Sequence, residues 1–383
     1  MKKLLNNNER YLITLLKNLL FAQEIEEKLE DVSFEEVLRI AKNHSIANMI
    51  YYAILKLKNK PNKEILNLWQ HEYTVGQIKD TFQKREAGIL KIEFEKNRIK
   101  NIFLKGFFLK KLYPKSDMRT MSDIDILILP EDRENCKVIL EKLGYSAKAY
   151  GVGREDIFLK KPAMNLEIHN NLFDESDKVC YNYFLDMSLM KKVKKLSEYS
   201  YDFSLEDHFI YNLVHTIRHF KSLGTGIKNV IDHWLYIKKL GDKLDWEYIN
   251  RALRELNILE FHEKLYHLGE VWFEDKESNE VIENLGRYIL DSGVYGKVEN
   301  YGINKGAKEL LFPSVDTMKE KFPILKEKEY LLPFCYVIRG IKILRVHGSD
   351  KVKRTLKSAL FSSKTDVNKR KKFYKDIGLD KFV

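Results

Sequence analysis

Two aspartates, Asp123 and Asp125, open an apolar stretch that ends at Leu129. A β-strand alternates its side chains, so both carboxylates project from one face while the isoleucines beside them point to the other. At a rise near 3.4 Å per residue the two acids lie roughly 7 Å apart, and they repel each other unless a cation lies between them. A hard divalent cation meets that need, because Mg2+ prefers carboxylate oxygens together with substrate phosphates. The pair therefore predicts metal-dependent phosphoryl chemistry.

A third acid lies on another predicted strand, residues 165–172, where Glu167 and His169 share one face. Two-metal nucleotidyl transfer uses three acids: two bridge the ions, and the third holds the catalytic ion and can accept the proton of the attacking hydroxyl. We therefore interpret Asp123, Asp125 and Glu167 as the catalytic residues. The same three residues are the predicted ligands of two Mg2+ ions, with Mn2+ as an alternative.

Groups that could bind phosphate precede these acids. Lys105 and Gly106 stand at a predicted strand-to-helix junction, where glycine lets a backbone N–H approach an anion. Lys105 adds a point charge, and Arg119 could pair with phosphate oxygens through two nitrogens. Ser122 completes the predicted nucleotide- and phosphate-binding set. Each residue alone also fits a turn, a cap or an ordinary surface charge, and the prediction depends on their combination.

A second group of polar residues falls in a predicted helical region. His208, His215 and His219 lie on one helix face, and the spacing of four between the last two would suit zinc. No glutamate lies between them and no cysteine is near, so a pocket wall that contacts nucleotide or acceptor is favoured over zinc, and plain packing is an equally open interpretation. Lys228 and Asp232 lie one helical turn apart, so they either form an ion pair with each other or face the predicted substrate cleft. His169, His215, His219, Lys228 and Asp232 form the predicted nucleotide or acceptor pocket.

Composition narrows the class of protein. None of the apolar runs in the 383 residues reaches the roughly 20 residues of a membrane span. The apolar N-terminal stretch is interrupted by Lys17 and repeats its leucines at helical spacing, which favours an amphipathic helix over a signal peptide. Cys136, Cys180 and Cys335 are scattered and lack the spacing of metal ligands, which favours a reducing compartment. The expected location is the cytoplasm.

The positive charge is concentrated near the C-terminus. The net charge is +11, and residues 351–383 hold eleven Lys or Arg against three Asp, a balance of +8. One interpretation is a solvated, partly frayed tail. The other is contact with a phosphate-rich partner such as RNA, whose attraction would be electrostatic and would weaken with salt.

Helical and strand patterns divide the chain. Residues 1–60 show helical periodicity, with Ser33 and Glu36 spaced as a capping box. Further helices are expected at about 63–100, in one or two turns at 107–113, from Pro130 to Gly144, and after Leu205. Strands are expected at about 102–104, 123–129, 156–160 and 165–172. The predicted organisation is an N-terminal helical region (1–98), an α/β core (99–195), a C-terminal helical region (196–350) and a basic segment (351–383).

These motifs resemble the nucleotidyltransferase superfamily whose best-known member is DNA polymerase beta. More closely, they resemble the bacterial family of uncharacterised nucleotidyltransferases, which has a Leu-Lys-Gly motif (104–106 here) and an Arg-x-Met-x-Asp-Ile-Asp motif (119–125 here). The likeness continues at 167–169, 215–220 and 224–232, and more weakly at 292–296. It implies an α+β fold: a minimal polymerase-beta-like core with a mixed sheet, flanked by helical regions, using Mg2+ and a nucleoside triphosphate. The usual Gly-Ser of the phosphate-binding turn is Lys105-Gly106 here, as in toxin-like members, so the turn geometry of Gly-Ser members does not transfer.

The leading functional hypothesis is transfer of a nucleoside monophosphate from a nucleoside triphosphate to an acceptor hydroxyl or phosphate, with release of pyrophosphate. Two alternatives stay open. Asp-x-Asp is also the metal motif of sugar-nucleotide glycosyltransferases, although these usually place a larger nucleotide-binding α/β domain before it. A protein of the same fold could also bind nucleotide or RNA without turnover. The acceptor (small molecule, RNA or protein), the preferred triphosphate and the oligomeric state are not indicated by the residues.

Overall fold

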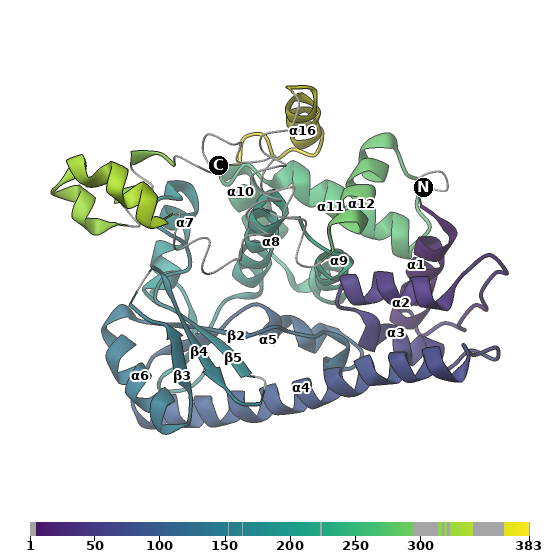
Figure 1. Ribbon diagram of the computed structural model, residues 1–383, viewed down its shortest axis with the longest axis horizontal. Helices are drawn as coiled ribbons and strands as arrows, with labels where there is room; N and C mark the ends of the chain where they lie inside the picture. Colours follow the sequence, from purple (N-terminus) through teal and green to yellow (C-terminus); the bar gives the residue numbers. More distant parts are fainter. Residues whose placement is uncertain are drawn as a thin grey trace.

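The computed structural model describes residues 5–151, 153–162, 164–222, 224–293, 313–315, 318–319, 322–339 and 364–382. The chain opens with three helices and a fourth that is much longer. This fourth helix runs along one side of the molecule, beneath both the other N-terminal helices and the sheet (Figure 1). The four helices are α1 (Asn7–Leu20), α2 (Phe34–Asn43), α3 (Ala47–Ile54) and α4 (Lys63–Lys96).

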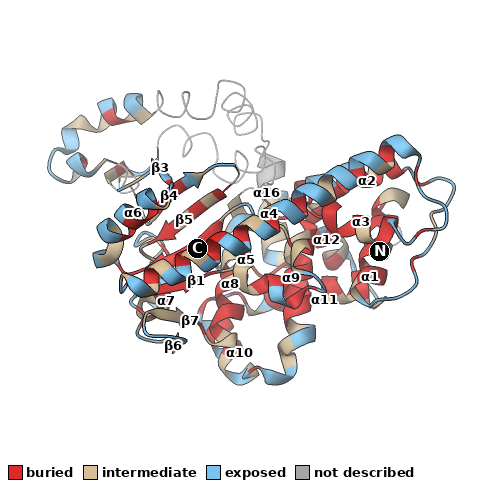
Figure 2. Ribbon diagram, turned by 90° about the horizontal axis from the view of Figure 1, so that it is seen from below, coloured by how far each residue is buried: buried red, intermediate tan, exposed pale blue. Residues whose placement is uncertain are grey.

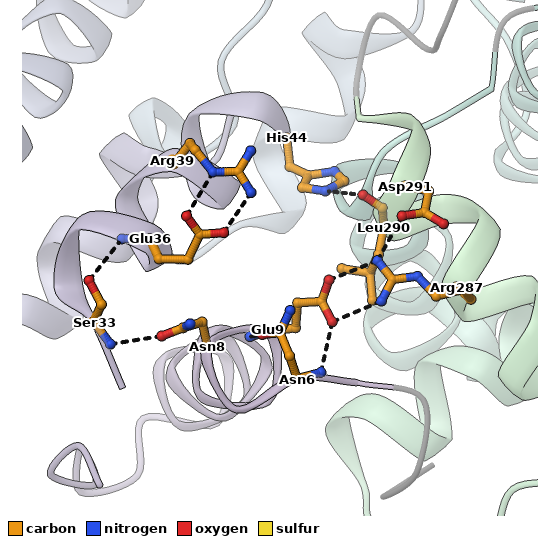
Figure 3. A network of polar contacts seen from close by, with 10 residues as sticks. All are labelled: Asn6, Asn8, Glu9, Ser33, Glu36, Arg39, His44, Arg287, Leu290 and Asp291. Atoms are coloured by element: carbon orange, nitrogen blue, oxygen red, sulfur yellow. Dashed lines mark hydrogen bonds and ion pairs between the residues drawn. The ribbon is translucent and has the colours of Figure 1, made fainter. Parts of the chain in front are cut away.

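Side-chain caps begin the first two helices. Asn6 and Glu9 form a reciprocal capping box on α1, each side chain accepting the other residue's backbone N–H. Ser33 caps α2 by accepting the N–H of Glu36, as its spacing predicts. The return bond is absent, because the Glu36 carboxylate binds the guanidinium of Arg39 instead (Figure 3). The predicted capping box at Ser33 is therefore only half formed.

A mixed sheet forms the centre of the fold. Its strand order is β3-β4-β5-β2-β1-β7-β6, in which β2 pairs parallel with β5 and antiparallel with β1. The remaining pairs are antiparallel except β1 with β7. The strands are β1 (Asn101–Phe103), β2 (Ile124–Ile128), β3 (Ser146–Ala149), β4 (Glu155–Lys160), β5 (Met164–His169), β6 (Lys194–Lys195) and β7 (Ser200–Asp202).

The two faces of the sheet have different surroundings. One face is apolar and packs against the second half of α4 and against α6 (Arg133–Lys142), whose buried side chains join those of β2 and β5 in one core. Figure 2 shows the central strands as buried and the outer side of α4 as exposed. The opposite face carries Asp125, Glu167 and His169 and lies under the C-terminal helices (Figure 1). Because side chains alternate along β2 and β5, the apolar residues pack on one face of the sheet and the acidic residues lie on the other.

Short elements connect the strands, and helices follow the sheet. The connecting elements are α5 (Gly106–Leu109), α7 (Lys178–Ser188) and the 3-10 turns η1 (Lys110–Leu112), η2 (Ser116–Met118) and η3 (Pro130–Asp132). The later elements are α8 (Leu205–Ser222), α9 (Ile227–Leu240), η4 (Gly241–Lys243), α10 (Trp246–Glu255), α11 (Leu259–Phe273), α12 (Glu280–Ser292), η5 (Pro323–Lys326), η6 (Glu329–Leu331) and α16 (Lys364–Asp376).

The N-terminal and C-terminal helices share one hydrophobic core, because buried residues of α1–α3 and of α8–α12 form a single cluster. A partly buried ion pair between Glu9 on α1 and Arg287 on α12 joins them (Figure 3). The predicted α+β fold with a mixed sheet and helical regions on both sides is confirmed. The division of the chain at residues 98, 195 and 350 stays a prediction.

The end of the basic C-terminal segment is packed rather than frayed. Residues 351–363 lie outside the described residues, but after α16 the side chains of Ile377, Leu379 and Phe382 are buried in the main core. The guanidinium of Arg370 lies 4.9 Å from the ring centre of Tyr288. The prediction of a frayed tail is wrong for residues 377–382, because three apolar residues follow the charges. The alternative of RNA contact stays a prediction.

Two further expectations concern the whole chain. Within the described residues, none of the helices combines the length and apolar character that crossing a membrane requires. Cys136, Cys180 and Cys335 are buried free thiols, and the reducing compartment expected from their spacing stays a prediction.

A buried histidine joins three helices and predicts acid sensitivity. His44 follows α2; its Nδ1 accepts the N–H of Ile227 at the start of α9, so its Nε2 carries the proton and donates to the carbonyl of Leu290 (Figure 3). Burial lowers the pKa of His44 from 6.5 to about 4. A histidine whose folded pKa is depressed stabilises the fold above its unfolded pKa, so this stability is lost as the pH falls from 6.5 to 4 and amounts to about 3 kcal/mol.

We expect His44→Gln to remove that part of the pH dependence. Urea unfolding at pH 7 and at pH 4.5 should show a smaller loss of unfolding free energy in the variant than in the wild type. His71→Gln changes an exposed histidine of α4 and serves as the control. Equal losses for all three proteins would contradict the assignment.

Candidate active site

The register of two neighbouring strands brings the acids together. β2 and β5 are parallel neighbours, and Asp125 pairs directly with Glu167 across them. Side chains at paired positions point to the same face, at a strand separation of about 4.8 Å. Asp123 precedes β2 by one residue and lies at the same edge. Asp123, Asp125 and Glu167 all line one cavity of about 460 Å3.

The cavity lies between the sheet and helices α8 and α9. Every predicted site residue except His169 lines it, although the predictions came from separate stretches of the sequence. These lining residues are Lys105, Gly106, Arg119, Ser122, Asp123, Asp125, Glu167, His215, His219, Lys228 and Asp232.

Lys105 is the cation closest to the acids. Antiparallel pairing of β1 with β2 continues through a bond from the Leu104 N–H to the Asp125 carbonyl, which places Lys105 beside Asp125. Its Nζ lies 2.6 Å from Asp125 Oδ1. The backbone of Lys105 has φ +47°, a conformation that is strained for a non-glycine residue and persists only where the surroundings enforce it. In this structure the ammonium neutralises Asp125, and the predicted contribution of Lys105 to phosphate binding stays a prediction.

His169 also contacts Asp125 and does not line the cavity. It is fully buried, and its Nε2 lies 2.9 Å from Asp125 Oδ1. Burial opposes ionisation of Asp125, but Lys105 and the bond from His169 hold its pKa below the usual range. Because an ionised carboxylate only accepts, His169 Nε2 must be the donor. The ring therefore orients Asp125, and the predicted contact of His169 with nucleotide or acceptor stays a prediction.

Among the described residues, Asp123 and Glu167 have no lysine or arginine in direct contact, and they crowd one another. Burial and the negative charge of Asp125 raise the pKa of Asp123. Burial, followed by the charges of Asp123 and Asp125, raises the pKa of Glu167 from 4.5 to about 8. The positive charges of Lys105, Lys228 and Lys79 oppose the rise in the pKa of Asp123 but do not cancel it.

This donor set fits a divalent cation. Ligand atoms of Asp125, Glu167 and His169 all lie within 4.8 Å of one another. His169 Nε2 is a hydrogen donor in this arrangement, so the carboxylate oxygens are the atoms open to a cation. Asp123 lines the same cavity but is not part of this tight group. Converging carboxylate oxygens are the ligands that a hard ion such as Mg2+ prefers, and the ion would also offset the negative charge that remains.

Arg119 is held by a residue far away in the sequence. Its Nε and Nη2 bind the two oxygens of Asp232 on α9 at 2.7 and 2.8 Å, and the hydroxyl of Tyr113 donates to the same carboxylate at 2.7 Å. All three side chains are buried. Asp232 occupies the edge of the guanidinium formed by Nε and Nη2. The predicted bidentate contact of Arg119 with phosphate stays a prediction. The third nitrogen, Nη1, lies against Gly106.

Lys228 and Asp232 do not pair with each other, which was one of the two sequence expectations. The Lys228 ammonium bonds to the carbonyl of Thr120 at 3.3 Å, while Asp232 binds Arg119. Burial and the charge of Arg119 lower the pKa of Lys228 from 10.5 to about 8. Lys228 therefore adds a positive charge to the cavity wall at neutral pH.

Gly106 is required by close packing. A Cβ at this position would lie 2.5 Å from Arg119 Nη1 and 2.5 Å from Met121 Sδ. We expect Gly106→Ala to cost about 1–3 kcal/mol of unfolding free energy through overpacking. It should also lower activity by displacing Lys105 or Arg119.

Gly88→Ala is the matched control, because a Cβ on this α4 glycine meets nothing within 4 Å. Alanine there should stabilise the helix by about 0.5–1 kcal/mol. Urea unfolding of both variants tests the contrast. A Gly106→Ala protein as stable and active as the wild type would refute the packing argument.

The helix α8 contributes a polar wall opposite the acids. His215 and His219 face the cavity with their Nε2 atoms 3.2 Å apart. Burial and the charge of Lys105 lower the pKa of both rings, that of His219 to about 4. His208 instead is packed, stacking on Phe108 and bonding to Asp202.

Several lining residues were not identified from the sequence. Asn212 and Thr216 lie on α8, each three residues before one of the two predicted histidines, His215 and His219. Residues at this spacing share a helix face, so the helical period would have identified them. Arg154 and Glu155 reach the cavity because β4 pairs antiparallel with β5 and Glu155 lies opposite His169. The sequence would have indicated this position only if the two predicted strands, 156–160 and 165–172, had been assigned to one β-hairpin.

Comparison with known proteins extends these observations. A family model described as "Uncharacterised nucleotidyltransferase" matches residues 30–274, well over half of the chain. The match contains the whole sheet and helices α8 and α9, which enclose the cavity. The weak motif at 292–296 lies beyond it, and residues 294–296 lie outside the described residues. Neither the curated proteins nor the solved structures that were compared include a match. Because the family model spans the sheet and both helices of the cavity, the chain belongs to this uncharacterised nucleotidyltransferase family.

Proposed function

We propose that this protein transfers a nucleoside monophosphate from a nucleoside triphosphate to an acceptor hydroxyl or phosphate and releases pyrophosphate. The observation that carries the proposal is the convergence of Asp123, Asp125 and Glu167 in one cavity with Lys105. Nucleotidyl transfer needs carboxylates that position cations and donors that stabilise a polyphosphate, and both are present here. Membership of a nucleotidyltransferase family supports the same activity.

Asp123, Asp125 and Glu167 are the residues that would hold Mg2+. When bound, Mg2+ supplies Lewis-acid stabilisation of the phosphoryl oxygens. His169 keeps the Asp125 carboxylate in a fixed orientation through its Nε2–H. Because Lys105 already contacts Asp125 Oδ1, it lowers the cost of holding this carboxylate ionised in a buried site.

The remaining roles follow from position and charge. Lys228 and the Nη1 side of Arg119 border the cavity beside Gly106, where they would stabilise the negative charge of the triphosphate and of the leaving pyrophosphate. The Glu167 carboxylate would accept the proton of the attacking hydroxyl.

A donor-consumption assay tests the proposal. The full-length protein is incubated with Mg2+, each of the four ribonucleoside triphosphates labelled at the α-phosphate, and acceptor mixtures of total RNA, protein or small metabolites. Parallel reactions contain labelled nucleotide sugars. Release of pyrophosphate with transfer of label supports nucleotidyl transfer. Transfer of sugar would show the glycosyltransferase alternative, and nucleotide binding without turnover would show the non-catalytic one.

A further inference from the structure

Two histidines in the cavity wall share a geometry that the nucleotidyl-transfer proposal does not use. His215 and His219 lie one turn apart on α8, their Nε2 atoms are 3.2 Å apart and their ring centres 4.4 Å apart. Among the described residues, the only hydrogen-bond partner of each ring is the other ring. In such a bond one Nε2 donates and the other accepts, so at least one ring is a neutral imidazole with its lone pair aimed at its neighbour.

The separation of these two nitrogens matches that of two ligands on one metal ion. Zinc binds imidazole nitrogen at about 2.0–2.1 Å with tetrahedral geometry, which places two nitrogen ligands roughly 3.3 Å apart. Histidines at i and i+4 on one helix face are a recurrent zinc-binding arrangement. The measured 3.2 Å needs almost no adjustment of the backbone to receive such an ion.

The helix holds the two rings firmly and leaves them accessible. The opposite side of α8 is buried in the main core through Leu213, Val214, Ile217 and Phe220. His215 and His219 instead line the cavity, and His219 is exposed to it. The positive charge of Lys105, which would repel a cation, is partly offset by its pairing with Asp125.

We propose that His215 and His219 bind one borderline transition-metal ion such as Zn2+, at a site distinct from the carboxylates of Asp125 and Glu167. The two sites would differ in preference, because imidazole nitrogen favours Zn2+, Cu2+ and Ni2+ whereas carboxylate oxygen favours Mg2+ and Mn2+. Two protein ligands leave further coordination positions directed into the cavity. Water or an oxygen of the substrate would fill them.

The test separates the two sites by mutation. Metal-free full-length protein carrying Asp123→Asn and Glu167→Gln is titrated calorimetrically with Zn2+, so that the carboxylate site keeps only Asp125, which stays paired with Lys105. One Zn2+ should still bind per chain. Adding His215→Asn and His219→Asn should weaken that binding by at least about a hundredfold, since both ligands are lost. His71→Asn, at an exposed position on α4, is the control and should leave Zn2+ binding unchanged.

A spectroscopic measurement guards against misfolded variants. Cu2+ added to the carboxylate-deficient protein (Asp123→Asn and Glu167→Gln) should give an electron paramagnetic resonance spectrum with hyperfine coupling to two imidazole nitrogens. Far-ultraviolet circular dichroism compares the folding of the histidine variants with that of the parent. Absence of stoichiometric Zn2+ binding in the carboxylate-deficient protein would overturn the proposal. So would binding that survives loss of both histidines, or a Cu2+ spectrum that shows fewer than two nitrogens.

Discussion

Replacing Asp125 by asparagine is expected to lower nucleotidyl transfer by about a thousandfold or more. The carboxylate is the point where Lys105, His169 and Glu167 converge, and a metal ion held there is worth several kcal/mol of transition-state stabilisation. Asparagine keeps the shape of the side chain but removes the charge. The change leaves Lys105 without its direct partner, which costs stability, but it also relieves the repulsion of Asp125 with Asp123 and Glu167, so we expect the protein to remain folded.

Initial rates at saturating Mg2+ and triphosphate measure this loss, with circular dichroism to compare the folds. Asp186→Asn, at a surface position on α7 where the aspartate pairs with Lys192, is the control and should retain full activity. Asp125→Asn protein that keeps more than about a tenth of the wild-type rate would exclude the proposed role of Asp125.

Asp232→Asn is expected to cost about 3–5 kcal/mol of unfolding free energy and most of the activity. The substitution leaves the guanidinium of Arg119 buried without a counter-charge, which is the costly outcome for a buried ion pair. Activity should fall as well, because Asp232 fixes Arg119 against Gly106 at the proposed phosphate site. Urea unfolding and initial rates measure the two effects separately.

The chain offers a matched comparison for this ion pair. Glu36 binds Arg39 through the same two-point geometry, with bonds of 2.8 and 2.6 Å, but both side chains are exposed. Glu36→Gln should therefore cost less than about 1 kcal/mol. If the two substitutions cost the same, burial does not determine the importance of the Arg119–Asp232 pair.

The sequence identified the acids because their signal is local. Period-two alternation assigns Asp123 and Asp125 to one face, and a second predicted strand supplies Glu167. The contacts that modify the site are long-range. Arg119 and Asp232 are 113 residues apart, and their pairing depends on how α9 packs over the sheet. The contact of Lys105 with Asp125 depends on the β1–β2 register, which short strands do not reveal.

The distinction between local signals and long-range contacts also explains which parts of the fold could be predicted. The long helix, the helix that ends before Gly144 and the strands of the acids were recognisable because their apolar residues repeat regularly. Strands β3, β6 and β7 were not predicted. Their residues are polar and largely exposed, so pairing with neighbouring strands rather than intrinsic preference makes them extended. In the C-terminal segment the many charged residues predict exposure to water, so the burial of Ile377, Leu379 and Phe382 was not expected.

The path of α4 bears on how the protein can be divided for expression. Ala87, Leu90 and Phe94 of this helix are buried against β2, so they belong to the sheet although they precede residue 99. A recombinant fragment that starts at residue 99 would present Ile126 and Ile128 to water and would tend to aggregate. The shortest piece worth producing therefore begins upstream of Lys63.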